Sequence, residues 1–265
     1  MQPEWGGPPI VDRRSFLQRL GLAAAGLAGI PVAGQPALAG MASGASTEAP
    51  VPGTAARRWR APEFVFARLR YDSGDWDYNP KVAANVLNSV VEYTNIRVYP
   101  EEVVIAASST ELLSFPFLFM TGHKLVRFTR EERDRLRAFV ESGGLLFSDD
   151  CNHDVNGLYA RSFENEMIAI FQKEGALPKL PRQHHLYRAF FRFDEGPPAT
   201  SHELNGWGDE IVHDYLRGLE RHGRLGVLYS NKDYGCEWDY DWRNKRFQRQ
   251  DNTKFAVNIV VYAMG

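Results

Sequence analysis

Long apolar runs, an excess of either charge and a rich supply of cysteine are all missing from this sequence of 265 residues. Its apolar N-terminal run, residues 20–32, is rich in Ala and Gly. It is shorter than the roughly 20 apolar residues that a membrane-spanning helix needs, so we predict no stable membrane span. The formal net charge is only −2. Because nucleic-acid-binding proteins carry a basic patch or stripe, nucleic acid is not an expected partner.

The sequence contains only two cysteines, Cys151 and Cys236, and neither a paired C-x-x-C nor an H-E-x-x-H motif. No standard zinc motif therefore marks the chain. In an oxidising compartment two cysteines often pair, which makes Cys151 and Cys236 a disulfide candidate. Free structural thiols, metal ligands and a thiolate nucleophile are the alternatives. The sequence leaves all four open.

The first 39 residues have the three parts of a signal peptide in the usual order. Arg13 and Arg14 precede the mildly apolar run, and Ala37-Leu38-Ala39 is a small-residue cleavage site. Paired arginines with weak hydrophobicity favour the twin-arginine route, in which the Tat translocase is a transient partner. We expect cleavage after Ala39 and a periplasmic or otherwise exported mature protein.

The rest of the chain divides into a leader and one domain. Residues 40–61, rich in Gly, Ala, Ser, Thr and Pro, have too few large apolar groups to bury a core and are expected to form a flexible leader. Residues 62–265 have the usual size of a single domain. Apolar runs predict strands at 64–71, 96–98, 103–106, 115–120, 145–147, 190–193 and 225–229. Helical periodicity predicts helices at 80–91, 129–142, 161–173, 207–219 and 253–264. This alternation predicts an α/β fold with a mostly parallel sheet and helices on both faces.

Four of the predicted strands run directly into polar loops, at 72–79, 121–124, 149–154 and 232–239. In open α/β sheets, ligands bind beyond the carboxyl ends of the strands. A parallel sheet would therefore gather the polar side chains of these loops at one edge, unless the loops are merely solvated. The residues gathered there are Asp72, Asp75, His123, Asp149, Asp150, Cys151, His153, Asp154, Asp233, Cys236 and Glu237.

This edge offers two kinds of chemistry. As acid, base or catalytic groups we single out Asp75, His123, Asp150 and His153. As ligands of a divalent metal ion we single out His123, Cys151 and His153, because thiolate and imidazole suit zinc or copper.

Two further stretches carry candidate ligand-binding groups. In residues 202–209, His202 and Glu203 would reach the edge, unless the stretch is a rigid turn around a buried Trp207. In residues 234–242, aromatic and acidic side chains alternate, which suits sugar or cationic ligands and equally a half-buried strand. The candidate ligand-binding residues are Asp72, Trp76, His202, Glu203, Asp233, Glu237 and Trp238. Three of the remaining histidines are expected at the surface, namely His184, His185 and His222. The fourth, His213, is expected to bond to Asp209.

Long motifs cover the chain from residue 64 to 265. They are YDSGDWDYNP at 71–80, MTGH at 120–123, SDDCNHD at 148–154, HELNGWGD at 202–209 and NKDYGCEW at 231–238. Together they resemble the bacterial family called domain of unknown function 4159. The resemblance implies a flavodoxin-like sheet similar to that of class I glutamine amidotransferase-like domains. Related domains often accompany MoxR-type ATPases and von Willebrand A-type proteins, and the family supplies no catalytic residues to transfer.

The chain departs from the amidotransferase pattern at its catalytic turn. Those enzymes carry a cysteine in a Gly-x-Cys-x-Gly elbow, whereas the comparable turn here is Thr121-Gly122-His123. Glutamine hydrolysis is therefore not expected. The sequence favours an exported protein with a polar site at the sheet edge, functioning as a metal-dependent hydrolase. The alternative is a non-catalytic binding or assembly module of the cell envelope for a glycan, a peptide or a protein partner.

Overall fold

The computed structural model describes residues 63–240 and 250–265. The predicted signal peptide at 1–39, the leader at 40–61 and the end of the aromatic–acidic stretch at 241–242 lie outside the described residues. Within the described ranges, no helix combines the length and apolar character needed to cross a membrane.

The described strands form one six-stranded sheet in the order β2-β1-β3-β4-β6-β5. The strands are β1 (Ala67–Arg70), β2 (Val103–Ala106), β3 (Phe117–Gly122), β4 (Leu145–Asp150), β5 (Arg217–Arg221) and β6 (Arg224–Ser230). All neighbours pair in parallel except β5, which is antiparallel to β6. Every residue of β3 and β4 is buried, which explains why these strands are nearly continuous apolar runs in the sequence.

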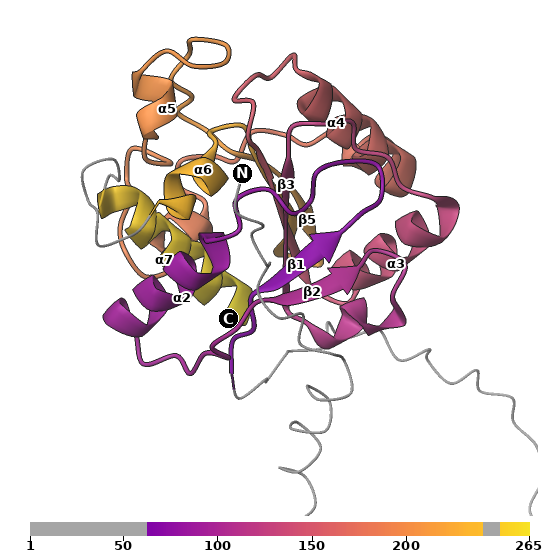
Figure 1. The fold of residues 1–265 in the computed structure, drawn as a ribbon, viewed down its shortest axis with the longest axis horizontal. Helices are drawn as coiled ribbons and strands as arrows, with labels where there is room; N and C mark the ends of the chain where they lie inside the picture. The colour runs from indigo at the N-terminus through magenta and orange to yellow at the C-terminus, as the bar shows by residue number, and fades with distance from the viewer. Residues whose placement is uncertain (1–62, 241–249) are drawn as a thin grey trace, which may run out of the picture. The chain divides into compact units, whose positions relative to one another are not determined.

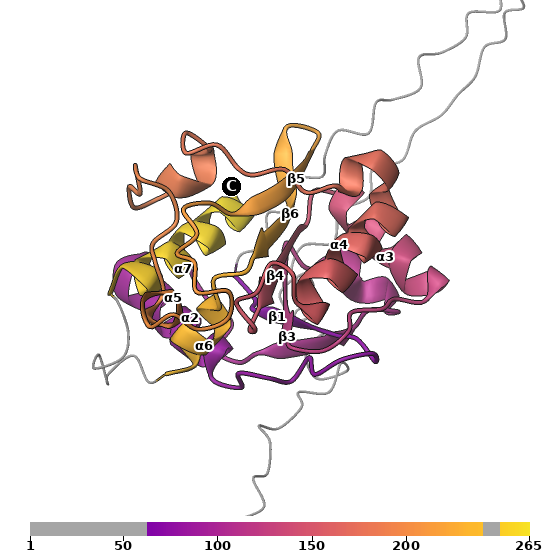
Figure 2. The same ribbon diagram turned by 90° about the horizontal axis from the view of Figure 1, so that it is seen from above.

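Helices cover both faces of this sheet, as Figures 1 and 2 show. One face carries α2 (Val82–Tyr93), α6 (Tyr234–Asp239) and α7 (Gln250–Met264), and the other carries α3 (Arg130–Glu141) and α4 (Leu158–Phe171). Shorter elements are α5 (Ser201–Leu204) and the 3-10 helices η1 (Thr110–Ser114), η2 (Gln172–Gly175) and η3 (His185–Arg188). The predicted α/β fold is confirmed. Helix α3 begins with a capping box formed by Thr129 and Glu132.

The strand order places a topological switch point between β1 and β3. From β1 the chain adds β2 on one side and then returns to add β3 and β4 on the other. The crevice outside the carboxyl ends of the strands at such a point is where doubly wound sheets bind ligands. The parallel strands follow the 2-1-3-4-5 order of flavodoxin-like sheets when β6 is counted fifth. The flavodoxin-like assignment itself and the closer likeness to amidotransferase domains stay predictions.

The helix predicted at 207–219 is wrong. Residues 207–216 form an irregular loop, and β5 follows it. Gly206, Gly208 and Glu210 have φ angles of 70°, 69° and 60°, in the left-handed region that interrupts a right-handed helix. The helix-like spacing of Ile211, Tyr215 and Leu219, on which the prediction was based, therefore does not reflect a helix.

Other predicted elements differ for local reasons. Residues 190–193 form no strand, because the backbone N–H and C=O of Phe191 bond to the side-chain amide of Asn258 at 2.7 and 2.9 Å. Val98 makes only an isolated bridge to Phe64. The aromatic–acidic stretch is helix α6 in its described part and not a half-buried strand. His184, expected at the surface, is buried.

Candidate functional site

The loops that follow β1, β3, β4 and β6 meet at the carboxyl edge of the sheet. The Tyr71 hydroxyl donates to the Thr121 carbonyl at 2.9 Å, which joins the ends of β1 and β3. The Cys151 N–H donates to the Gly122 carbonyl at 3.2 Å, which joins β3 to β4. The Asp149 carboxylate accepts from the N–H of Gly235 at 2.6 Å, which joins β4 to α6. The parallel order thus brings the four polar loops together.

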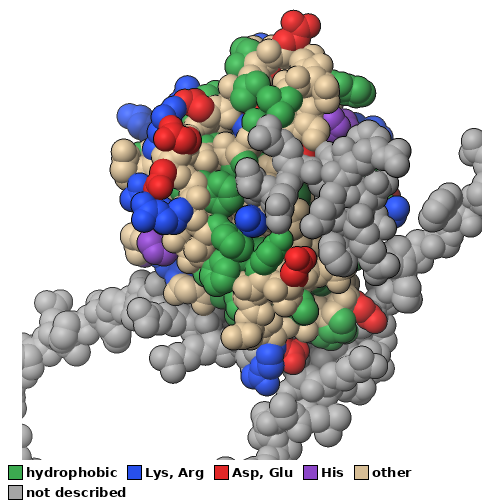
Figure 3. Space-filling model, turned by 90° about the vertical axis from the view of Figure 1, so that its left-hand side faces the viewer, with side chains coloured by type: hydrophobic (Ala, Val, Ile, Leu, Met, Phe, Trp, Pro, Cys, Tyr) green, Lys and Arg blue, Asp and Glu red, His purple; other side chains and the backbone are tan. Residues whose placement is uncertain are grey.

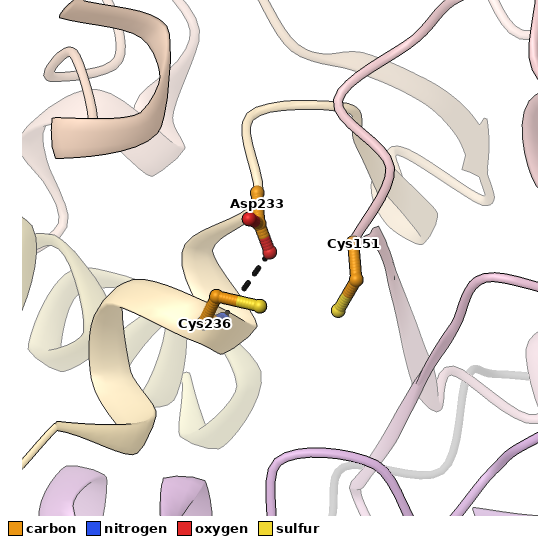
Figure 4. Close-up of side chains that lie close together, drawn as sticks. All are labelled: Cys151, Asp233 and Cys236. Atoms are coloured by element: carbon orange, nitrogen blue, oxygen red, sulfur yellow. Dashed lines mark hydrogen bonds between the residues drawn. The ribbon is translucent and has the colours of Figure 1, made fainter. Parts of the chain in front are cut away.

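Cys151, Asp233 and Cys236 form a compact group at this edge, here called the cysteine group. One ligand atom from each lies within 4.8 Å of the other two. Both thiols are free, and Figure 4 shows the sulfur atoms pointing toward one another beside the Asp233 carboxylate. Cys151 is buried at the end of β4, whereas Cys236 is partly exposed in the first turn of α6. The group is therefore reachable from the Cys236 side.

Hydrogen-bond donors point at both sulfur atoms. The side-chain nitrogen of Asn79 lies 3.1 Å from Cys151 Sγ and 3.5 Å from Cys236 Sγ. The Thr121 hydroxyl also lies 2.9 Å from Cys151 Sγ, but it donates its proton to the Asp149 carbonyl at 3.0 Å and so accepts from the thiol. A donor shared by two sulfurs favours their anionic form, since hydrogen bonding to a charged form stabilises it.

The electrostatic surroundings of the cysteine group are nevertheless acidic. Burial raises the pKa of the Cys151 thiol, and nearby Asp233 raises it further. For Cys236, a hydrogen bond from Cys151 lowers the pKa, but burial and Asp233 raise it by more. Burial, followed by Asp233, also raises the pKa of Asp149. Several groups that become negative on ionisation therefore share a small buried volume, which a cation would complement.

Two nearby basic groups have partners of their own. Lys232 is held by the carboxylate of Glu203, with Nζ–Oε distances of 2.6 and 2.7 Å. His202 pairs through Nδ1 with Asp233, and this contact raises the pKa of His202. His202 thereby orients the carboxylate that belongs to the cysteine group.

Asp75 and His123 form a dyad across the switch point. Asp75 Oδ2 lies 3.0 Å from His123 Nδ1, and Asp75 Oδ1 accepts from the N–H groups of His123 and Lys124 at 2.9 and 3.2 Å. Burial raises the pKa of Asp75, but these hydrogen bonds outweigh it and leave the pKa below its ordinary value. The His123 side chain is 29% exposed, so a carboxylate-oriented imidazole is available at the edge.

Tyr78 links the dyad to the cysteine group, although the sequence reasoning did not select it. Its ring stands edge-on to that of His123, with centroids 4.1 Å apart. Burial raises the pKa of its phenol, and charges on Cys236, Cys151 and Asp233 raise it further. Tyr78 is 43% exposed, so its ring is accessible beside His123. The only available signal was its position in the polar loop after the first strand.

Arg68 fixes the loop that carries Asp75, Tyr78 and Asn79. Its buried guanidinium donates to the backbone carbonyls of Trp76, Tyr78 and Asn79 at 3.3, 2.8 and 2.9 Å. Glu102 accepts from its Nε at 2.6 Å. One side chain thus holds three carbonyls of the loop in place.

Several residues predicted to bind a ligand instead hold the edge together. Glu203 pairs with Lys232, and Glu237 accepts from the N–H and hydroxyl of Ser201 at 2.9 and 3.0 Å. Trp238 packs in the core and stacks on Tyr234, with ring centroids 5.3 Å apart.

The remaining predicted ligand-binding residues, Asp72 and Trp76, lie in the first loop, exposed and half-buried respectively. Asp150, predicted to be catalytic, is fully buried and accepts from Asn152 N–H at 2.9 Å and from the Tyr229 hydroxyl at 3.2 Å. Burial raises the pKa of Asp150 to about 7.

The structure does not bring His123, Cys151 and His153 together as one set of metal ligands. The His153 ring contacts the carbonyl oxygens of Asn231 and Ile211, which turns it toward a different group. Among the described residues, His153 is grouped with Asp209 and His213, while Cys151 is grouped with Asp233 and Cys236. The expected bond between His213 and Asp209 is present at 2.9 Å.

Comparison with known proteins places these residues in a family. No curated protein matches the chain. The model of the family described as domain of unknown function (DUF4159) matches residues 65–264, which include all the residues of both groups and the dyad. The chain belongs to this DUF4159 family.

Proposed function

We propose that this protein is an exported, metal-dependent hydrolase whose metal ion is held by Cys151, Asp233 and Cys236. The observation that carries the proposal is the convergence of these three ligand atoms within 4.8 Å at the ligand-binding edge of the sheet. Two thiolates and a carboxylate are ligands that zinc takes in proteins. A catalytic zinc site has three protein ligands and leaves a position for water or substrate.

The surrounding residues suit this role. Asn79 donates toward both sulfurs, and His202 contacts Asp233, as outer-shell groups do around metal ligands. A metal ion would supply a nucleophilic water by lowering its pKa. His123, oriented by Asp75, would act as the general base or acid, and Tyr78 would position the substrate between the two.

The proposed location rests on the N-terminal sequence. Arg13-Arg14, the weakly apolar run and Ala37-Leu38-Ala39 have the order of a twin-arginine signal. In this proposal the folded protein acquires its metal ion before export through the Tat translocase. Metal-bound thiolates would then be protected from oxidation in the periplasm.

Elemental analysis of the exported protein, purified without a histidine tag, tests the metal site. We expect zinc in the wild type and the loss of about one equivalent in Cys151→Ser, Cys236→Ser and Asp233→Asn. Asp154→Asn is the matched control, because Asp154 lies in the same edge loops but outside the cysteine group. Equal metal content in all of these proteins would refute the site.

A hydrolysis assay tests the activity separately. Metal-loaded protein is tested on nitrophenyl esters and phosphoesters, with His123→Gln as the variant. We expect His123→Gln to keep its metal and to lose at least ~100-fold in rate, the usual contribution of general acid–base catalysis. Equal rates in both proteins would remove His123 from the mechanism.

A binding module of the cell envelope is the second candidate function. It is favoured by exposed apolar side chains at the end of α5 and on the loop that follows, namely Leu204, Trp207, Ile211 and Val212. Apolar side chains lie on the upper part of the face in Figure 3, at the height of α5 in Figure 1. Binding of glycan or peptide fragments that is weakened by Trp207→Ala, without any hydrolysis by metal-loaded protein, would favour this function.

A further inference from the structure

We propose that His153, Asp209 and His213 form a second site for a divalent transition-metal ion such as zinc, with a structural role. This histidine group shares no residue with the cysteine group, so the inference does not depend on the proposed hydrolase. One ligand atom from each of the three residues lies within 4.8 Å of the other two. Imidazole nitrogens and a carboxylate oxygen are ordinary zinc ligands.

The three side chains converge from two distant segments of the chain. His213 Nε2 lies 2.9 Å from one carboxylate oxygen of Asp209, and His153 Nε2 lies 3.5 Å from the other. The same His153 nitrogen lies 2.9 Å from the backbone carbonyl oxygen of Ile211. Two ring nitrogens and a carboxylate thus face one another beside a backbone carbonyl, and the first three are ligand types that zinc takes in proteins.

The contacts of the His153 ring contain a conflict that a cation resolves. Both ring nitrogens contact carbonyl oxygens, Nδ1 that of Asn231 and Nε2 that of Ile211. A carbonyl only accepts hydrogen bonds, and a neutral imidazole has one N–H to donate. With that N–H directed to Asn231, Nε2 presents a lone pair to the oxygens of Ile211 and Asp209. A cation removes this repulsion: either a second ring proton, since both nitrogens of an imidazolium donate, or a metal ion bound between these atoms. The zinc stoichiometry described below distinguishes the two.

The Nδ1 contact is also the support that a metal-binding histidine needs. Histidine ligands generally donate their second N–H to a backbone carbonyl or a carboxylate, which fixes the ring. Asn231 supplies this carbonyl from the loop after β6. The His153, His213 and Asp209 side chains are only 1%, 4% and 10% exposed, as expected for a closed site.

The backbone around the histidine group is folded tightly. His153 and Glu210 have φ angles of 49° and 60°, which non-glycine residues seldom adopt. Gly208 has a φ of +69°, and a Cβ atom there would lie 1.9 Å from the His153 carbonyl oxygen. The Asp209 N–H donates to the same carbonyl at 2.9 Å. A metal ion would compensate for this conformation and hold the loop at 207–213 against the end of β4.

Zinc stoichiometry tests the proposal. Protein without a histidine tag is stripped with a chelator, titrated with Zn²⁺ and measured by elemental analysis after removal of excess ion. We expect His213→Gln and Asp209→Asn each to bind about one equivalent less than the wild type. His222→Gln is the matched control, because His222 also pairs with a carboxylate, that of Glu141 at 2.9 Å, but is exposed. Unchanged stoichiometry in His213→Gln and Asp209→Asn would overturn the proposal.

A cysteine-free protein keeps the test decisive if the histidine variants do not fold. In Cys151→Ser/Cys236→Ser, all three residues of the histidine group are intact, so the protein should still bind about one Zn²⁺ and melt at a higher temperature with it. Co²⁺ bound to this protein should absorb in the visible range but lack thiolate charge-transfer bands. Absence of bound metal from the folded cysteine-free protein would exclude the histidine group as a site.

The two proposals fail in different ways. Loss of zinc only in the cysteine variants would leave the hydrolase site in place and remove the structural one. Loss only in His213→Gln and Asp209→Asn would do the reverse.

Discussion

Lys232 and Glu203 form an ion pair in which both side chains are completely buried. Lys232 Nζ lies 2.6 and 2.7 Å from the two carboxylate oxygens and also donates to the His213 carbonyl. Glu203 further accepts from the N–H groups of Thr200 and His213 at 2.9 Å each. The pair therefore joins Lys232, the residue before Asp233, to α5 and to His213 in the loop before β5, and so supports both candidate metal sites.

Glu203→Gln should be strongly destabilising, because it leaves the Lys232 ammonium buried without its counter-charge. Breaking a buried pair in this way costs about 3–5 kcal/mol of unfolding free energy, measurable by urea denaturation. The double variant Glu203→Gln/Lys232→Met should recover part of the loss, since it removes the unpaired charge. A cost below about 1 kcal/mol, the range of surface ion pairs, would contradict the expected role of this pair.

Arg68→Lys should loosen the 72–79 loop without unfolding the sheet. A lysine ammonium cannot reproduce the forked contacts of the guanidinium with three carbonyls and Glu102. We expect faster amide hydrogen exchange in residues 72–79. We also expect zinc binding at the cysteine group to weaken by about 10-fold, the lower end of the usual effect of outer-shell mutations, because Asn79 loses its support.

Arg70→Lys is the control for this experiment, since Arg70 lies on the same strand but is exposed. It should change neither exchange nor zinc affinity. If Arg68→Lys behaves as Arg70→Lys does, the loop is held by other contacts and Arg68 is not a positioning residue.

Regular elements with strong patterns could be predicted from the sequence. Buried β3 and β4 are continuous apolar runs, and α3 begins with a capping box that sequence spacing reveals. The polar loops after these strands could be placed at one edge because parallel strands require it. The predictions of secondary structure failed for residues 190–219, because distant side chains such as Asn258 and Lys232 determine the structure there.

The site was predicted as a location more successfully than as a set of partners. Asp75 and His123 do lie together, because their loops flank the switch point. His153 and Cys151 are two residues apart in sequence but join different groups, since a left-handed backbone at His153 turns its side chain away. Glu203, Glu237 and Trp238 were selected for their polarity or aromaticity, and each proved to be buried by tertiary contacts. Local sequence cannot show such contacts.

His184 should make stability dependent on pH. Burial lowers the pKa of His184 from its ordinary 6.5, although nearby Glu220 opposes the shift. Its Nδ1 accepts from the Leu186 N–H at 3.1 Å, and protonation there would break that bond. Because the unfolded chain then binds the proton more readily, this contribution to stability is complete above pH 6.5 and is lost as pH falls toward the lower folded pKa.

Urea denaturation between pH 5 and pH 8 measures this effect. The stability of His184→Gln should fall less steeply below pH 6.5 than that of the wild type. His185→Gln is the control, since the neighbouring His185 is exposed. Parallel pH profiles for His184→Gln and the wild type would show that the buried ring does not contribute.

The cysteine group makes a prediction that separates metal binding from disulfide formation. Cys236 is the more exposed thiol and Cys151 is buried, so in reduced, metal-free protein a thiol reagent should modify Cys236 first. Coordination engages both sulfurs, so bound Zn²⁺ should slow this modification at least ~10-fold, as thiolate bound to metal is not free to react. Cys151→Ser identifies the reacting thiol, because only Cys236 remains in it.

Protein recovered from the periplasm provides the deciding count. After denaturation with a chelator and without a reductant, a metal-bound cysteine group yields two free thiols and releases its zinc. A Cys151–Cys236 disulfide yields no free thiol, and oxidised protein should bind no zinc at this group because both sulfurs are consumed. The two states exclude each other, since the same two sulfur atoms form either one covalent bond or two metal bonds. Periplasmic protein without free thiols would thus refute the proposed catalytic metal site and establish the disulfide, whereas zinc at His153, Asp209 and His213 would be unaffected.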